Sequence, residues 1–479
     1  MPRAPVDNEG TELFYADSGP VLGSTDYTTL VIYHGSAFTG HTFHKLLPFG
    51  AKDNIRFVIV NRRDYAGSTK YTDDNLKDLN EGKAAFMERL GAEVAHLLVW
   101  FSETHKIPKI SADGKSGGFS LMGWSMGNAT PMALFAYPDF PIYISSDSIK
   151  HTTDPPFLAF GYDQPPEGYN PFTDPNLPTQ EAIFVNFGFW VSGYYNHPDL
   201  ASRSVPSLNF DKRGELPDPN NPKSTGRPFS INNMTEDEMK VNFDGVAASR
   251  TEFPMFFPMQ PALNVQAQKV LFDEKQVNEV LPKAEVVHIW CTRAQWYCVY
   301  GMMETERQYK ESLKKGEKVR PIRFVEIEGA NHFVHWDEPE KFWAATVNVE
   351  KRRDVPHNQE PFSQKTTPGP SLNETRSISN KAAAALLKLT NDTHELAASL
   401  CQAGSVAAAL FAAVQAQLLS IAPTGDTQAI RTLKVFAFAG LFSNLGATSA
   451  YVAWGRTMAW DLFAFCVMSE YTYGSPKLL

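Results

Sequence analysis

GFSLMGWSMGNATPMALFAYP, residues 118–138, is the stretch of the sequence that decides the fold. Its first half is an apolar run typical of a buried strand, and its second half has the composition of a helix. Gly123-Trp124-Ser125-Met126-Gly127 therefore falls on a tight turn between them, where a serine hydroxyl projects above a sheet. The two glycines avoid clashes with neighbouring backbone. We predict that Ser125 is a nucleophile rather than an ordinary turn residue.

The segments before this stretch alternate between predicted strands and helices. TLVIYHG (Thr29–Gly35) and RFVIVNRRD (Arg56–Asp64) are apolar, β-branched runs typical of buried parallel strands. Between Lys83 and Lys106, apolar residues recur every three or four positions, which predicts one long amphipathic helix. Strands and crossover helices in alternation predict an α/β fold with a mostly parallel sheet and helices on both faces.

A candidate base follows the last predicted strand. PIRFVEIEG (Pro321–Gly329) predicts that strand, and GANHFVHWDEPEKF follows directly. His332 lies on the loop after it, whereas His335 stands beside a helix start that acidic residues and a proline indicate. We predict that His332 is the base and that His335 packs at the start of the helix.

These landmarks together resemble the α/β-hydrolase superfamily over about residues 10–352. The matching pieces are ELFYADSG, VIYHG, RRDYAGS, GWSMG and GANHFVHWDEPEKF, in the family's order. The resemblance implies an α/β-hydrolase sheet with an inserted, mainly helical cap. Serine at the nucleophile position is similar to the esterase, lipase, lactonase and C–C hydrolase branches, whereas epoxide hydrolases and haloalkane dehalogenases carry aspartate there. It also implies an oxyanion hole made by the amides of Ser36 and Met126, and His34 is expected to be structural.

The position of the acid departs from the family pattern. Members usually carry it after the penultimate strand, in a Gly-x-x-Asp sequence, but no carboxylate occurs between Glu285 and Glu304. Some members place it one strand earlier, which is SIKHTT here and ends in Asp154. Asp154 is therefore the candidate acid, with Asp147 and Glu304 as alternatives, and a turn role before two prolines remains open for it.

The rest of the chain is expected to divide as follows. The core comprises 1–154 and 282–352, interrupted by an aromatic-rich cap insertion, 155–281, that would line an apolar or aromatic pocket or form its own core. A polar linker, 353–380, leads to an all-α tail, 381–479. Two uncharged runs, Leu396–Gly425 and Val435–Gly455, predict a membrane hairpin within 396–455.

A soluble helical hairpin is the alternative for the tail, because buried amides are costly in lipid. Those amides belong to Gln402, Gln415, Gln417 and Asn444. The tail resembles the membrane-hairpin tails appended to some fungal proteins.

Composition excludes several classes of protein. A net charge of −9 provides no basic surface for nucleic acid, and four cysteines in 479 residues are too few for a disulfide scaffold. The N-terminus lacks the apolar core of a secretory signal. We therefore expect the cytoplasmic side of an intracellular membrane, or the cytoplasm if the tail is soluble.

The residues and the resemblance together predict a serine hydrolase that acts by acyl transfer on a small, ester-like substrate of apolar or aromatic character. The sequence contains no cluster with metal-ligand spacing and no Gly-rich phosphate loop. No metal or organic cofactor is expected. Two alternatives stay open: a non-catalytic receptor or membrane-tethered scaffold, and a lyase or acyltransferase using the same triad.

Overall fold

The computed structural model describes residues 2–112, 114–138, 149–221 and 223–351. The chain divides into two units, 1–357 and 358–479, and the second lies wholly outside the described residues. The predicted linker, the predicted tail and its two uncharged runs lie outside them as well. Among the helices that are described, none combines the length and apolar character needed to cross a membrane.

Eight strands of the described residues form one sheet, in the order β1-β2-β4-β3-β5-β6-β7-β8. The first two strands run antiparallel to their neighbours, and all pairs from β4 to β8 are parallel. The predicted mostly parallel sheet is thus confirmed. The strands are β1 (Arg3–Pro5), β2 (Glu12–Asp17), β3 (Thr28–Tyr33), β4 (Ile55–Val60), β5 (Phe119–Trp124), β6 (Ile149–Thr153), β7 (Val286–Cys291) and β8 (Ile322–Ile327).

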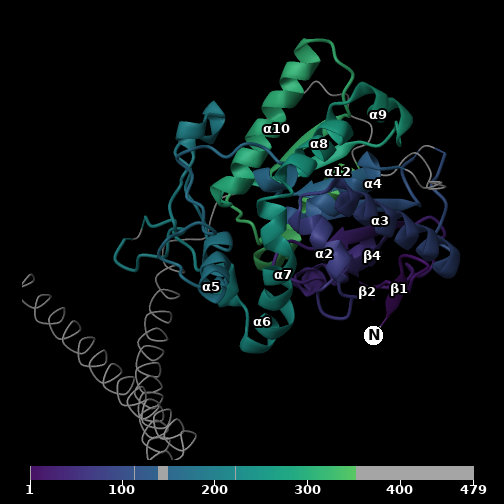
Figure 1. Ribbon diagram of the computed structural model, residues 1–479, viewed down its shortest axis with the longest axis horizontal. Coiled ribbons are helices and arrows are strands. Elements are labelled where there is room, and N and C mark those ends of the chain that lie inside the picture. The colour runs from purple at the N-terminus through teal and green to yellow at the C-terminus, as the bar shows by residue number, and fades with distance from the viewer. Residues whose placement is uncertain (1, 113, 139–148, 222, 352–479) are drawn as a thin grey trace, which may run out of the picture. The chain divides into compact units, whose positions relative to one another are not determined.

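Helices cover both faces of this sheet (Figure 1). Arg56 and Phe57 are neighbours in β4, so their side chains point to opposite faces. The Arg56 guanidinium carbon lies 5.8 Å from the ring centre of Phe101, and the Phe57 ring lies 5.0 Å from that of Trp343. The α-helices in the described part are α1 (Leu47–Gly50), α2 (Asp73–Asn80), α3 (Ala84–His105), α4 (Ala129–Ala136), α5 (Gln180–Val191), α6 (Glu236–Asn242), α7 (Gly245–Phe256), α8 (Gln260–Leu271), α9 (Glu274–Glu279), α10 (Trp296–Lys314), α11 (Val334–Asp337) and α12 (Pro339–Lys351).

Strand register brings the chemistry-bearing loops to one edge of the sheet. Tyr33 of β3 pairs with Gly123 of β5, Trp124 pairs with Thr153 of β6, and Thr153 pairs with Ile289 of β7. The carboxyl ends of these parallel strands therefore lie together, which is where ligands bind in open α/β sheets. The residues that follow β3, β5 and β6 are His34, Ser125 and Asp154.

Part of the chain between β6 and β7 returns to the loop after β3. Two backbone hydrogen bonds connect the junction of α6 and α7 to this loop. The Asp244 N–H donates to the Ala37 carbonyl at 2.8 Å, and the Thr39 N–H donates to the Asn242 carbonyl at 2.8 Å. The ring of Phe243 lies 5.3 Å from that of Phe38 between these two bonds. This part of the insertion thus covers the strand ends near Ser125.

The last two helices of the predicted insertion, α8 and α9, contact helix α4 of the core. The side-chain amide of Gln266 donates to the Ala129 carbonyl of α4 at 2.9 Å, and that of Gln276 donates to the Phe135 carbonyl at 2.6 Å. Both helices therefore pack on the helical layer beside the sheet.

Candidate active site

Ser125 is the first residue of a short 3-10 helix, η3 (Ser125–Asn128), directly after β5. Its φ of 56° lies in the left-handed region, which is strained for a residue with a side chain. A Cβ on Gly123 would lie 2.5 Å from the Cα of Asn128, and one on Gly127 would collide with the His34 carbonyl oxygen. The turn therefore requires both glycines, because no side chain fits beside the serine.

His332 and Asp154 are in direct contact across 178 positions of sequence. Nδ1 of His332 lies 2.6 Å from Oδ2 of Asp154, and both side chains are almost completely buried, at 1% and 0% exposed. The other ring nitrogen, Nε2, is buried and has no hydrogen-bond partner among the described residues. The imidazole is thus hydrogen-bonded through Nδ1, and its Nε2 has no partner among the described residues.

Hydrogen bonds to β7 and to Cys298 hold Asp154 in place. Its φ is 45°, and its N–H donates to the Ile289 carbonyl at 2.7 Å. Oδ1 accepts the backbone N–H of Cys291 at 3.1 Å, and its carbonyl accepts the Cys298 thiol at 3.0 Å. Both carboxylate oxygens are therefore engaged, and the side chain cannot rotate without breaking a bond.

Trp124 connects the serine turn to the histidine loop. Its indole N–H donates to the His332 carbonyl at 3.0 Å, and its ring lies 4.9 Å from the His332 imidazole. Because Trp124 directly precedes Ser125, this bond brings the two predicted residues to the same part of the sheet edge.

The loop after β3 lies against the serine. A Cβ on Gly35 would lie 2.7 Å from the Cβ of Ser125, so the backbone approaches the nucleophile as closely as glycine permits. The next amide, that of Ser36, donates to no group among the described residues. Met126 lies in the first turn of η3, where backbone N–H groups lack an acceptor within the helix. The amides of Ser36 and Met126, which the resemblance implies as the oxyanion hole, thus lie on the two backbone segments that meet at Ser125.

His34 has a hydrogen-bond partner at each ring nitrogen, which is consistent with the structural role expected for it. Nδ1 contacts the Gly35 carbonyl at 2.8 Å, and Nε2 accepts the backbone N–H of Arg62 at 3.0 Å. Burial lowers the pKa of His34 well below its ordinary value, so the ring stays neutral with one donor and one acceptor nitrogen.

The competing candidates lie in other surroundings. The His335 ring stacks on Phe43 with centroids 4.2 Å apart, and burial lowers its pKa well below the ordinary value. Glu304 accepts hydrogen bonds from Arg307 and Gln308 on its own helix. Asp147 lies outside the described residues.

Cys298 is a site residue that sequence reasoning missed. Its Sγ lies 3.5 Å from Nδ1 of His332, so ligand-type atoms of Asp154, Cys298 and His332 lie within 4.8 Å of one another. Burial, together with the charge of Asp154, raises the pKa of the thiol well above its ordinary value. Since the thiolate is the form that binds metals, this cysteine suits a hydrogen-bond donor better than a ligand. No spacing pattern marks it in the sequence.

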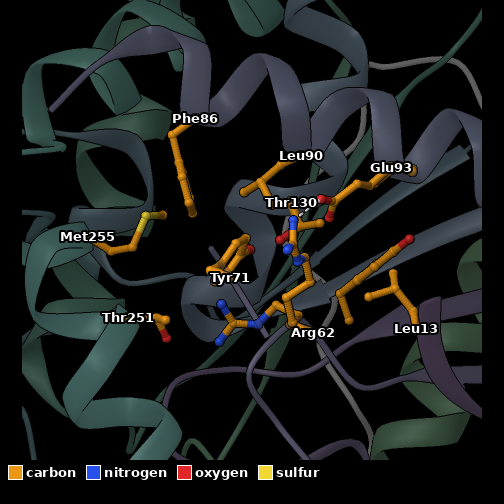
Figure 2. Close-up of a pocket in the computed structure, with 12 residues that line it drawn as sticks. Leu13, Arg62, Tyr71, Phe86, Leu90, Glu93, Thr130, Thr251 and Met255 are labelled. Carbon is orange, nitrogen blue, oxygen red and sulfur yellow. Dashed lines mark hydrogen bonds and ion pairs between the residues drawn. The ribbon is translucent and has the colours of Figure 1, made fainter. Parts of the chain in front are cut away.

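A cavity without Ser125 or His332 in its lining lies between α3, α4, α7 and the loop after β4 (Figure 2). It holds an ion pair of 3.0 Å between Arg63 and Glu93. Burial raises the pKa of Glu93 to about 7. The lining residues are Leu13, Tyr33, Arg62, Arg63, Tyr71, Phe86, Leu90, Glu93, Val94, Thr130, Thr251 and Met255.

Solved structures similar to this chain share little sequence with it. A bromoperoxidase from Bacillus anthracis is 12% identical, with a TM-score of 0.43 over 73% of this chain and 99% of its own. Epoxide hydrolase A from Mycobacterium thermoresistibile is 16% identical, with a TM-score of 0.41 over 74% and 98%. An esterase from Exiguobacterium antarcticum is 14% identical, with a TM-score of 0.41 over 73% and 100%.

No curated protein sequence matches the chain. The sequence pattern of the alpha/beta hydrolase family, in contrast, matches residues 30–345. This match spans well over half of the chain, and the protein therefore belongs to the alpha/beta hydrolase family.

Proposed function

We propose that this protein is a serine hydrolase that cleaves a carboxylic ester or a related acyl bond through an acyl-enzyme intermediate. The observation that carries the proposal is the 2.6 Å contact between Asp154 Oδ2 and His332 Nδ1. It is supported by Ser125 on a left-handed turn whose preceding residue donates to the histidine loop. A base held by an acid at the same sheet edge as a serine hydroxyl is the arrangement that activates a weak nucleophile.

In the proposed reaction, Ser125 Oγ attacks the carbonyl carbon while His332 Nε2 takes the hydroxyl proton. Asp154 holds the Nδ1–H and stabilises the imidazolium that forms. The amides of Ser36 and Met126 donate to the oxyanion of the tetrahedral intermediate. The imidazolium then protonates the leaving alcohol. In the second half, water attacks the acyl-enzyme while His332 takes its proton. The bond to Ser125 Oγ then breaks, the imidazolium returns the proton to Oγ, and the acid product leaves.

The absence of a carboxylate after the penultimate strand is the main argument for a non-catalytic protein. Asp154 in contact with His332 supplies a carboxylate from the neighbouring strand and favours turnover. A lyase or an acyltransferase would use the same residues and would differ in the bond broken or in the acceptor.

For the substrate, we propose a small ester with an apolar or aromatic acyl group. The ring of Phe38, directly beyond the proposed oxyanion loop, lies 4.8 Å from that of Phe333, 5.3 Å from that of Phe243 and 6.3 Å from that of Trp124. The rings of Phe38, Phe333 and Trp124 are buried and make the surroundings of the serine turn apolar, which supports an apolar acyl group.

For the location, we propose the cytoplasmic side of an intracellular membrane, reached through 396–455. Full-length protein is then expected in the membrane pellet after carbonate washing. Recovery in the supernatant without detergent would replace this proposal with a cytoplasmic enzyme whose tail is a soluble helical hairpin.

The direct test of function is hydrolysis of p-nitrophenyl esters of graded acyl length by wild type and Ser125→Ala. The variant is expected to lose turnover by about 10⁴-fold or more while its melting temperature changes little, because only one hydroxyl is removed. Ser312→Ala is the matched control, since it removes a buried hydroxyl from α10. Turnover that survives in Ser125→Ala would refute the mechanism.

A further inference from the structure

Helix α7 of the insertion carries a buried carboxylate that points at the loop after β3. Glu252 is 0% exposed, and its Oε2 accepts the hydroxyl of Ser36 at 2.8 Å. The two residues are 216 positions apart. A buried charge is costly unless it is paired and hydrogen-bonded, so the partners of this carboxylate define its role.

The second oxygen of Glu252 binds two side chains of the loop after β4. Oε1 accepts NH2 of Arg62 at 2.5 Å and the hydroxyl of Tyr65 at 2.6 Å. Figure 2 shows the Arg62 side chain extending toward the helix that carries Thr251. The carboxylate is therefore charge-balanced and bridges α7 to two separate loops of the core.

Both of these side chains also hold the loop that contains Ser36. The NH2 group of Arg62 donates to the Gly35 carbonyl at 2.8 Å, and the Ala37 N–H donates to the Tyr65 hydroxyl at 2.9 Å. Ala37 has a φ of 64°, a left-handed conformation that the surroundings must maintain. Three consecutive residues, 35–37, are thus held either by Glu252 itself or by a side chain bonded to it.

This arrangement sets the direction of one amide. The Gly35 carbonyl and the Ser36 N–H belong to one planar trans peptide, so they point in opposite directions. Fixing the carbonyl oxygen with Arg62 therefore aims the N–H away from it. This N–H directly follows Gly35, where an added Cβ would lie only 2.7 Å from the Cβ of Ser125.

We infer that Glu252 is a positioning residue for the oxyanion hole, and this inference rests on the proposed function. Through Ser36, Arg62 and Tyr65 it holds the Gly35–Ser36 peptide in the orientation that stabilises the oxyanion. Because α7 belongs to the insertion, the hole is complete only when this helix is seated on the core. Preorganised donors contribute to the transition state more than to the bound substrate.

The test is kinetic analysis of full-length Glu252→Gln, which keeps the shape of the side chain and removes its charge. We expect kcat to fall by about tenfold or more, with KM changing less than about threefold, because an oxyanion donor acts in the transition state. Affinity for a trifluoromethyl ketone, which forms a tetrahedral adduct with a serine, is expected to fall in parallel with kcat.

Arg250→Gln is the matched control on the same helix. Arg250 joins α7 to the loop after β4 through Asp64 Oδ1 at 3.0 Å and the Tyr71 carbonyl at 2.7 Å, and it has no hydrogen bond to residues 35–37. This variant is expected to lower the melting temperature while kcat stays within about twofold of wild type. If Glu252→Gln does not fold, Tyr65→Phe provides the test, since it deletes one hydroxyl and its bonds to Glu252 and Ala37.

The outcomes separate the two proposals. A folded Glu252→Gln with unchanged kcat, or with a change confined to KM, overturns the inference and leaves the serine mechanism in place. An equal loss of kcat in Arg250→Gln also overturns it, because seating of α7 in general would then explain the effect. A wild-type protein that neither hydrolyses esters nor reacts with the ketone overturns the proposed function and the inference with it.

Discussion

The ends of two neighbouring strands, β6 and β7, contribute to the site in different ways. Strand β6 ends in Asp154, whose carboxylate contacts His332. Strand β7 ends in Cys291, and no carboxylate occurs between Glu285 and Glu304. Its end and the following helix α10 provide support instead, since the Cys291 N–H and the Cys298 thiol both donate to Asp154.

This difference indicates that the site needs a carboxylate beside Nδ1 of His332, whichever of the two strands carries it. Strands β6 and β7 are adjacent and parallel, with Thr153 paired to Ile289. A side chain from either end therefore starts close to the histidine loop. What distinguishes the two ends is the set of donors that holds the acid in place.

The largest expected effect concerns the base that both strand ends serve. His332→Ala should lower kcat by about 10⁴-fold or more, and combining it with Ser125→Ala should add little, because triad members act as a unit. His335→Ala is the control, since its ring stacks on Phe43 and should affect stability more than turnover. Ester kinetics and melting curves measure both. A reversed ranking would identify His335 as the base.

The second largest effect is expected when the acid is moved from the end of β6 to the loop after β7. Asp154→Ala should lower kcat by about 10³- to 10⁴-fold. Adding Ala294→Asp should restore part of it, because the preceding residue, Arg293, donates its N–H to the Ala330 carbonyl of the histidine loop at 2.8 Å. Adding Ser312→Asp instead should restore nothing. No recovery with Ala294→Asp would mean that the donors around Asp154 matter as much as the carboxylate.

The smallest effect concerns the support from α10. Because burial raises the pKa of Cys298, the thiol should stay protonated and resist iodoacetamide in the native protein at pH 8. Cys298→Ala should lower kcat only severalfold, since it removes one weak donor, and Cys298→Ser should recover the loss. Rapid alkylation of native Cys298, detected by mass spectrometry, would contradict this description.

The sequence predicted the regular elements closely because their patterns are local. The helix expected between Lys83 and Lys106 is α3, Ala84–His105, and the apolar positions that defined its face are buried. The strand expected at Thr29–Gly35 is β3, Thr28–Tyr33. Asp154 could be proposed because some members of the family that the sequence resembles carry the acid one strand earlier, and the strand expected there ends at this residue.

Contacts between residues far apart in the chain have no corresponding pattern in the sequence. Glu252 meets Ser36 across 216 positions, and Cys298 meets Asp154 across 144, so neither spacing could be read from the chain. The described residues of the range 155–281 form no strand, and for that reason the helices that pack on α4 could not be separated from those over the strand ends. Only the folded arrangement distinguishes them.

The central claim is that Ser125 is activated by a base whose acid comes from β6. The most direct measurement is the rate at which a fluorophosphonate labels Ser125 in wild type and in Asp154→Asn, with the labelled peptide identified by mass spectrometry. The account predicts rapid labelling of wild type at Ser125 alone and a loss of about 10³-fold or more in the variant, because the amide cannot hold the required tautomer. Equal labelling rates in the two proteins, or no labelling of wild type, would contradict it.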